Sequence, residues 1–276
     1  MFKQRVITAV VLVLGLLALL FNLSPLSFSL VVAPIVLLAG WEWANLIGLQ
    51  GKRHKLAYLG LLALGLAVAG FTLNLFGRLD MSLGQNLCLA ASVLWAVIFL
   101  WVQGYPSSAI LWSPKPILGL LGLVLLSITW VAIALIIHQP HGAWLLLFAI
   151  AVVAIADIGG YVAGNLFGKH KLAPLVSPGK TWEGFAGGIL LQCILIASMT
   201  SFMPEKITTG MLLALVIPVS LYSVLGDLFE SMVKRHGGVK DSGNILPGHG
   251  GVLDRIDGLI AALPLFILLF LLLSPF

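Results

Sequence analysis

Charged residues are scarce in this chain of 276 residues. Asp, Glu, Lys and Arg together make up 9% of it, whereas soluble domains contain about 25%. This scarcity excludes a soluble globular protein, and it excludes disorder because no hydrophilic tract is long enough to stay solvated. Cysteine is rarer still, and both copies, Cys88 and Cys193, lie inside apolar runs. We interpret them as small buried hydrophobes, not as a disulfide or metal ligands.

Hydrophobic residues make up 60% of the chain instead. A helix that crosses a hydrocarbon core of about 30 Å needs about 20 mostly apolar residues, and nine segments approach that length. The sequence therefore predicts an all-α, polytopic integral membrane protein with about nine transmembrane helices. Short connections predict a single transmembrane domain over residues 1–276, with N-terminal spans in 1–140 and the functional site in 141–276. The predicted spans are 5–21, 26–47, 57–76, 86–102, 116–137, 142–164, 184–203, 211–231 and 256–273.

The charges that are present gather on one side of these spans. With the N terminus in the cytoplasm, 13 of the 15 Lys and Arg residues fall in cytoplasmic segments, and only Arg78 and Lys206 fall outside. This asymmetry satisfies the positive-inside rule. Acidic residues are costly in a membrane unless they are paired, metal-bound or facing water, yet all except Asp80 and Glu205 also lie on the cytoplasmic side. The net charge of +5 suits lipid headgroups or phosphorylated substrates, and we expect no nucleic-acid partner.

The densest polar stretch covers residues 231–257 and is rich in glycine. Glycine permits backbone conformations in which successive N–H groups point into one concavity, a geometry that binds phosphate. A basic loop that only contacts headgroups is the alternative, but such a loop needs no Asp254-x-x-Asp257 pair at the start of the next helix. The cations around this stretch are Lys234, Arg235, Lys240 and Arg255.

A polar stripe precedes this loop on the same predicted helix. Asp227, Glu230, Ser231 and Lys234 recur at i, i+3, i+4 and i+7, so they share one helix face. An ion pair between Glu230 and Lys234 that reaches the interface is the simpler interpretation of part of the stripe. Capping could likewise explain one of the two aspartates that open the last helix.

A second polar group lies in residues 157–184. Asp157 and Tyr161 are one helical turn apart. Gly160, Gly164 and Gly168 recur at every fourth residue of the same segment, which predicts close helix packing. The triplet Gly179-Lys180-Thr181 suggests a P-loop, but that motif requires a glycine where this chain has Pro174. What remains is a loop with Ser177, Lys180 and Thr181 entering a helix N-terminus, an arrangement suited to phosphate.

Two further residues have weaker signals. Glu42 lies between Trp41 and Trp43, and we interpret the two indoles as part of an interfacial aromatic belt. His249 lies in the run Pro-Gly-His-Gly-Gly, where a catalytic role, a phosphate contact and a purely architectural role all stay open. The remaining histidines have no spacing typical of metal ligands.

These motifs resemble those of the phosphatidate cytidylyltransferases, also called CDP-diacylglycerol synthases. Residues 157–161 and the run Ser177-Pro178-x-Lys180-Thr181-x-Glu183-Gly184 are similar to a second block of this family, although Gly179 stands where a basic residue is expected. Residues 1–140 match only in being hydrophobic spans. The main signature is carried by Ser231-x-x-Lys234-Arg235, Lys240-Asp241-x-Gly243, Pro247-Gly248-His249-Gly250-Gly251 and Asp254-Arg255-x-Asp257.

The resemblance implies an inner-membrane enzyme with its active site on the cytoplasmic side. It would join CTP and phosphatidic acid into CDP-diacylglycerol and pyrophosphate with Mg2+, leaving a second cation and a homodimer open. Because the phosphatidate phosphate is already an anionic nucleophile, the reaction needs charge neutralisation more than a strong base. The implied metal ligands are Asp227 and Asp254, with Asp257 beside them. The other implied catalytic residues are Lys234, Arg235, Arg255 and His249. The implied substrate-binding residues are Asp157, Tyr161, Ser177, Lys180, Thr181, Glu183, Ser231, Lys240, Asp241, Gly250 and Gly251.

Two other classes of protein were compared with this pattern. A CDP-alcohol phosphotransferase would also use clustered acids in a helical membrane domain, but its D-G-x-x-A-R run is missing. A cation-coupled transporter would need a polar relay to the far side, where only Asp80 and Glu205 are found. The cytidylyltransferase interpretation is therefore favoured.

Overall fold

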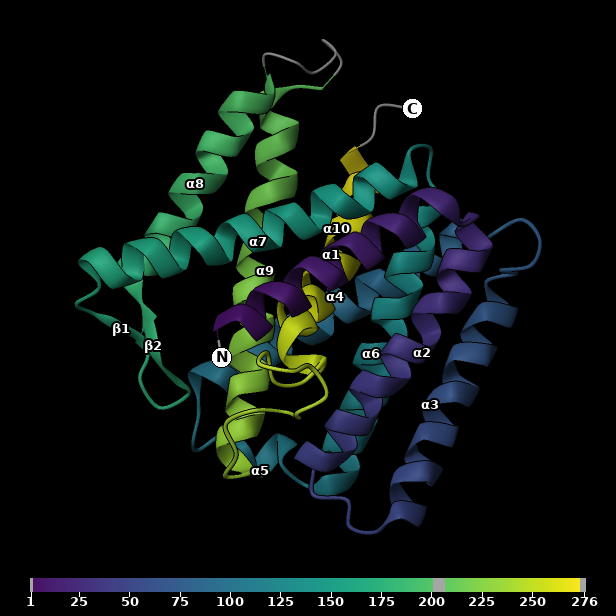
Figure 1. The fold of residues 1–276 in the computed structure, drawn as a ribbon, viewed down its shortest axis with the longest axis horizontal. Coiled ribbons are helices and arrows are strands. Elements are labelled where there is room, and N and C mark those ends of the chain that lie inside the picture. The colour runs from purple at the N-terminus through teal and green to yellow at the C-terminus, as the bar shows by residue number, and fades with distance from the viewer. Residues whose placement is uncertain (1, 201–206, 274–276) are drawn as a thin grey trace.

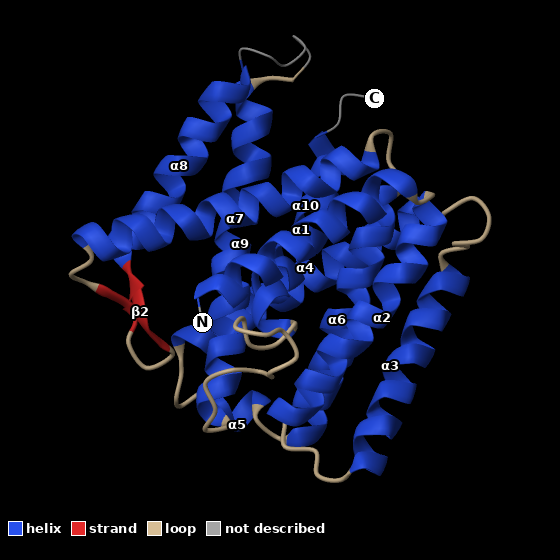
Figure 2. Cartoon of the chain, viewed as in Figure 1, coloured by secondary structure: helices blue, strands red, loops and turns tan. Residues whose placement is uncertain are grey.

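The chain folds into a helical bundle with one small hairpin (Figures 1 and 2). The computed structural model describes residues 2–200 and 207–273, so Glu205, Lys206 and the end of the predicted span 184–203 lie outside the described residues. The elements in order are α1 (Phe2–Asn22), α2 (Pro25–Leu46), α3 (Lys52–Thr72), α4 (Met81–Gln103), α5 (Ala109–Trp112), α6 (Lys115–Ile137), α7 (Gly142–Phe167), β1 (Lys171–Ala173), β2 (Ser177–Thr181), α8 (Trp182–Thr200), α9 (Thr209–His236) and α10 (Leu253–Leu273).

The predicted membrane architecture is confirmed. Within the described residues, eight helices are long and apolar enough to cross a membrane, namely α2, α3, α4, α6, α7, α8, α9 and α10. The first predicted span forms a shorter apolar helix over Val6–Asn22. It lies obliquely across the bundle in Figure 1, and Thr8 Oγ1 donates to Pro247 O at 3.1 Å in the loop before α10. The short α5 and the antiparallel β1–β2 hairpin were not expected from the sequence.

Local chemistry sets several helix starts. Ser24 caps α2, where Pro25 occupies the first turn, and Asp80 accepts from Leu83 N at 2.9 Å to cap α4. The C-terminal end of α9 lies at His236, beyond the predicted end at residue 231. The charged residues of this last turn are accommodated because they pair with each other and with α10, as described below.

The core lies between α2, α4, α6, α9 and α10. Phe229 of α9 packs between two buried indoles, with centroid distances of 6.0 Å to Trp43 and 5.6 Å to Trp95. Trp43 is only 3% exposed and donates from Nε1 to Leu118 O at 2.9 Å. The interpretation of Trp43 as a belt residue was therefore wrong, because a backbone carbonyl inside the bundle satisfies its polar atom.

Small residues let α7 and α8 approach closely, as the glycine spacing predicts. A Cβ added at Gly159 would lie 2.8 Å from Gly187 O, and one added at Gly184 would lie 2.7 Å from Gly160 O. Neither position therefore tolerates a side chain without moving a helix. This contact places the hairpin, which joins the two helices, directly below their crossing (Figure 1).

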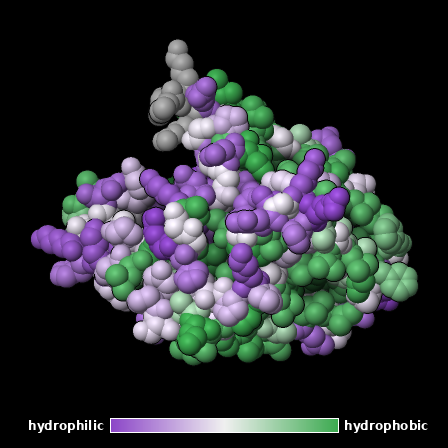
Figure 3. Space-filling model, turned by 90° about the horizontal axis from the view of Figure 1, so that it is seen from below, coloured by the Kyte–Doolittle hydropathy of each residue, from purple (hydrophilic) through white to green (hydrophobic). Residues whose placement is uncertain are grey.

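One end of the bundle collects the polar loops. The hairpin, α5 and the loop 237–252 lie at this loop-bearing end in Figure 2, together with the starts of α3, α6 and α10. Viewed from below, hydrophilic side chains spread over much of this face and hydrophobic ones border it (Figure 3). The predicted convergence of charge on one face is thus visible in the fold.

Candidate active site

A pocket of about 440 Å³ opens between α7, β2, α8 and α9. Its polar part contains Asp157 of α7, Lys180 of β2 and Asp227 of α9. Lys180 Nζ lies 2.6 Å from Asp227 Oδ2. The hairpin therefore places a lysine beside a carboxylate of α9, which lies far away in the sequence. The same pocket is also lined by apolar side chains, among them Ile189 and Val224. A phosphate group attached to an apolar body suits this mixture of charged and apolar residues.

Other predicted residues line the same pocket. Ser177 and Thr181 come from β2 and Tyr161 from α7, where it is 73% exposed. Thr181 is buried, and its Oγ1 accepts from Gly184 N at 3.1 Å, which caps the first turn of α8. Thr181 therefore already has a structural role beside the pocket.

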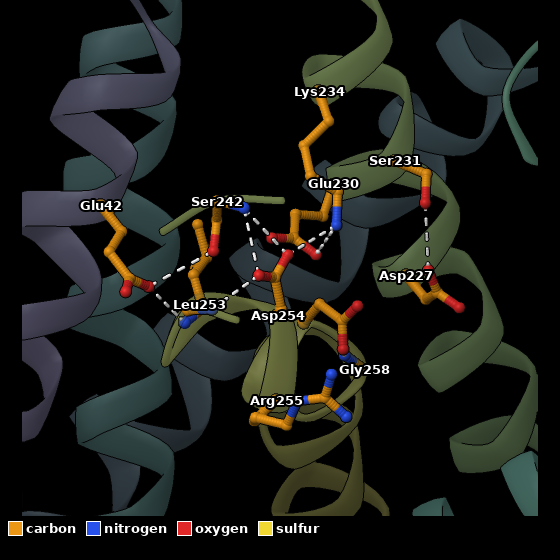
Figure 4. A network of polar contacts seen from close by, with 12 residues as sticks. Glu42, Asp227, Glu230, Ser231, Lys234, Ser242, Leu253, Asp254, Arg255 and Gly258 are labelled. Atoms are coloured by element: carbon orange, nitrogen blue, oxygen red, sulfur yellow. Dashed lines mark hydrogen bonds and ion pairs between the residues drawn. The ribbon is translucent and has the colours of Figure 1, made fainter. Parts of the chain in front are cut away.

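The polar stripe of α9 leads from this pocket towards α10 (Figure 4). Ser231 Oγ donates to Asp227 Oδ1 at 3.2 Å, and Lys234 Nζ lies 3.0 Å from Glu230 Oε2. Both pairs are i, i+4 contacts on one helix face, as the spacing indicates. The ion pair considered as the simpler interpretation does form, but it lies inside the fold, with the Lys234 side chain 11% exposed and that of Glu230 3% exposed.

Lys234 also reaches the last helix. Its Nζ lies 2.8 Å from Asp254 Oδ1 in the first turn of α10. Asp254 accepts further from Ser242 N at 3.1 Å and from Gly251 N at 2.8 Å. Three donors, one of them charged, therefore hold this carboxylate in a defined orientation.

Asp227 and Asp254 make their closest contacts with different partners. Asp227 faces Lys180 and Ser231, whereas Asp254 faces Lys234 and the loop amides. Asp257 lies near both groups, because its carboxyl is repelled by the charge of Asp227 and attracted by that of Lys234. Joint metal binding by Asp227 and Asp254 stays a prediction.

Comparison with known proteins shows the family of the chain. The cytidylyltransferase family model matches residues 3–273. The chain belongs to the cytidylyltransferase family. It is 41% identical to the phosphatidate cytidylyltransferase of Haemophilus influenzae over 96% of this chain and 97% of the relative. It is 40% identical to the enzyme of that name from Pseudomonas aeruginosa over 96% of each chain. The similarly named Staphylococcus saprophyticus protein is 47% identical over 51% of this chain and 55% of the relative.

The remaining cations of this family member lie around the loop 237–252. Arg255 donates from Nε and Nη2 to His249 O, at 3.1 and 2.9 Å, and Arg235 Nε donates to Val176 O in the hairpin turn at 3.4 Å. Lys240 and Asp241 are exposed. Arg255 thus connects the loop to α10, and Arg235 connects the hairpin to α9. Among the described residues, Lys180 is the predicted cation that lines the pocket.

A tight turn in this loop explains part of its glycine content. Leu246 and Gly250 form a backbone bridge, and Gly250 has a φ of +84° that a residue with a Cβ adopts only with strain. His249 lies within the turn with its Nδ1 buried. The amide of Gly251, one of the two predicted glycine donors, donates to Asp254 in this structure.

Glu183 anchors the hairpin. Its carboxylate accepts from Lys169 N at 3.1 Å and lies 2.6 Å from His170 Nδ1, which joins the end of α7 to the start of α8. Among the described residues, the pocket lining includes Asp157 and Lys180 but not Glu183. Its predicted contact with substrate stays a prediction.

The donor types at the site fit the Mg2+ that the family resemblance implies. Asp227, Asp254 and Asp257 supply hard carboxylate oxygens, and Lys180 and Lys234 show that a positive charge is accommodated beside Asp227 and beside Asp254. Mg2+ takes one or two protein carboxylates and completes its coordination with water and substrate phosphates. Within the described chain, no three His, Cys, Asp or Glu side chains already form a metal cluster.

Sequence reasoning missed the role of Glu42. Its carboxylate is buried and accepts from Val252 N, Leu253 N and Ser242 Oγ, at 3.0, 2.7 and 3.3 Å. The partners lie about 200 residues away along the chain, so no local spacing connects them. The only available signal was an acid near the end of an apolar helix, which is costly without partners.

Proposed function

We propose that this protein transfers the cytidylyl group of CTP to phosphatidic acid, forming CDP-diacylglycerol and pyrophosphate. The observation that carries the proposal is the pocket in which the Lys180–Asp227 ion pair lies among apolar side chains such as Ile189 and Val224. This combination suits a phosphate attached to a lipid. The two relatives matched over 96% of this chain are both named phosphatidate cytidylyltransferase, which supports the same substrate pair.

The chemistry needs little proton transfer. An oxygen of the phosphatidate phosphate attacks the α-phosphorus of CTP, a new P–O bond forms, and the bond to the β-phosphate oxygen breaks to release pyrophosphate. The protein must mainly hold two anionic groups together. In our proposal Lys180 exchanges Asp227 for a phosphate oxygen when substrate binds, while Lys234 holds Asp254 in the first turn of α10.

Mg2+ would neutralise charge on the triphosphate when bound. We assign Asp227 and Asp254 as the residues that hold it, with Asp257 beside them, and each of the first two is balanced by a lysine in this structure. A second cation remains part of the proposal. A homodimer also remains part of the proposal.

We place the protein in the inner membrane with the loop-bearing end in the cytoplasm. The bacterial relatives and the eight candidate spans among the described residues support a multi-pass inner-membrane protein. The basic residues at the starts of α3 and α6, in the hairpin and around the loop 237–252 lie at one end of the bundle. The positive-inside rule assigns that end to the cytoplasm, where CTP is available.

The direct test uses purified protein in detergent micelles with CTP, phosphatidate and Mg2+. We expect pyrophosphate and CDP-diacylglycerol in equal amounts. Diacylglycerol, which lacks the attacking phosphate, should give neither product. A folded protein that releases no pyrophosphate from CTP and phosphatidate would show the proposal to be wrong.

A further inference from the structure

Glu42 connects the N-terminal spans to the loop that carries the family signature. Its side chain comes from the last turns of α2, is 1% exposed, and points at the junction between this loop and α10 (Figure 4). There it accepts from two consecutive amides, Val252 N at 3.0 Å and Leu253 N at 2.7 Å. A third contact comes from Ser242 Oγ at 3.3 Å. All three partners donate, which suits a carboxylate because it offers only acceptors.

The two amides lie at the start of a helix, where backbone N–H groups need acceptors from outside the helix. The first N–H groups of a helix have no intrahelical acceptor, and a side chain just before the helix normally provides one. At the start of α10 this acceptor comes instead from α2. A carboxylate is favoured at this place because the helix N-terminus carries a partial positive charge.

Glu42 and Asp254 both accept hydrogen bonds from residue 242 and from neighbouring amides at residues 251 and 252. Ser242 offers its hydroxyl to Glu42 and its amide to both Asp254 oxygens at 3.1 Å. Similarly, Gly251 N donates to Asp254 while the next amide, Val252 N, donates to Glu42. Moving the Glu42 carboxylate would therefore displace donors that orient Asp254.

Two glycines of the loop allow this approach. A Cβ added at Gly243 would lie 2.5 Å from Glu42 Oε1, and one added at Gly251 would lie 2.6 Å from Glu42 Oε2. At these distances a Cβ would push the Glu42 carboxylate away from the amides that donate to it. The loop is thus shaped around the carboxylate, which accounts for two glycines that phosphate binding alone does not explain.

We propose that Glu42 is a positioning residue that holds the loop 237–252 and the first turn of α10, so that Asp254 stays aligned with Lys234. The catalytic consequence rests on the proposed function. Both oxygens of Glu42 accept from the backbone at the start of α10, so it acts through the loop and not on the substrate.

The test combines amide hydrogen exchange, measured without ligand, with steady-state kinetics, both on Glu42→Gln in the whole chain. Gln keeps the volume but turns one oxygen into a donor that opposes the donors of the loop. Amide hydrogen exchange at Val252 and Leu253 should accelerate about tenfold or more, the size expected for a lost hydrogen bond to a charged group. Exchange in the core of α6 should stay unchanged.

The kinetic arm measures kcat and KM for CTP and phosphatidate separately. We expect kcat to fall about tenfold with little change in either KM, because the pocket is intact and only the alignment of Asp254 is disturbed. Glu42→Asp, which retains the charge, should restore part of kcat and part of the exchange protection. Tyr58→Phe is the matched control, since it removes one buried hydrogen bond to Gly119 O without touching the loop.

The outcomes separate the inference from the function. Unchanged exchange at Val252 and Leu253, unchanged kcat, or an equal rise of exchange in α6 would overturn the positioning role. If Glu42→Gln fails to insert, Ser242→Ala removes one contact to Glu42 and should raise exchange and lower kcat several-fold, and no change in either would refute the inference. Absence of product from wild-type protein with normal exchange would contradict the proposed function alone.

Discussion

Lys234 is predicted to be the most stabilising cation of the site. Lys234→Met keeps most of the side-chain length but removes the ammonium that lies 3.0 Å from Glu230 and 2.8 Å from Asp254. The three side chains are 11%, 3% and 7% exposed, so solvent screens the pair only weakly. Removing one partner of a buried ion pair costs about 3–5 kcal/mol, because an uncompensated charge is left behind.

The assay is equilibrium unfolding in mixed micelles with increasing SDS, followed by circular dichroism. The matched control is His170→Gln, which breaks the contact of 2.6 Å with Glu183 at a site where His170 is 78% exposed. Exposed pairs contribute about 0–1 kcal/mol, so this variant should unfold almost like wild type. A second change, Glu230→Gln, should recover part of the loss in the Lys234→Met background, because it removes one of the unpaired carboxylates. A loss below about 1 kcal/mol for Lys234→Met would refute the reasoning.

Three other predictions concern the pocket, the metal and the topology. Lys180→Gln should raise KM for phosphatidate or CTP about tenfold, since one charge-assisted contact to phosphate is lost, as measured by steady-state kinetics. Asp227→Asn and Asp254→Asn should each abolish most turnover without preventing membrane insertion, and the double variant should be little worse, because ligands of one metal act as a unit. Cys193 is exposed and not buried as expected from the sequence, so it is first replaced by Ser. A cysteine at position 170 should then label only from the cytoplasm and one at position 141 only from outside.

Control variants and opposing outcomes test the predictions for the pocket, the metal and the topology. Lys171→Gln removes an exposed charge from the same hairpin, so it should leave KM unchanged; an equal effect of both lysines would mean general attraction of anions. Asp80→Asn retains an N-cap at the opposite end of the bundle and should stay fully active. Near-normal turnover of Asp227→Asn or Asp254→Asn at low Mg2+ would remove that residue from the metal assignment. Reversed labelling of the two cysteines would overturn the orientation.

Local sequence patterns were sufficient for the helical architecture and for part of the site. Long apolar segments have to become helices in a bilayer, because the backbone has no water to bind. The spacing of Asp227, Ser231 and Lys234 implied a shared helix face, and the contacts on α9 confirm it. The glycine repeat likewise predicted the tight approach of α7 to α8. These features depend only on periodicity within one helix, which the order of residues determines directly.

Tertiary structure alone decided which charges meet. Lys180 reaches Asp227 because an unforeseen hairpin turns beneath α7 and α8, and Lys234 reaches Asp254 because the loop 237–252 brings α10 back beside α9. Glu42 could be suspected only as a costly acid in an apolar helix, and its partners could not be named because they lie about 200 residues away. Such contacts depend on how whole helices pack and where loops close. In a membrane protein, packing also decides whether a sparse charge faces lipid, water or an opposite charge, and here it buried Glu42 against the amides that begin α10.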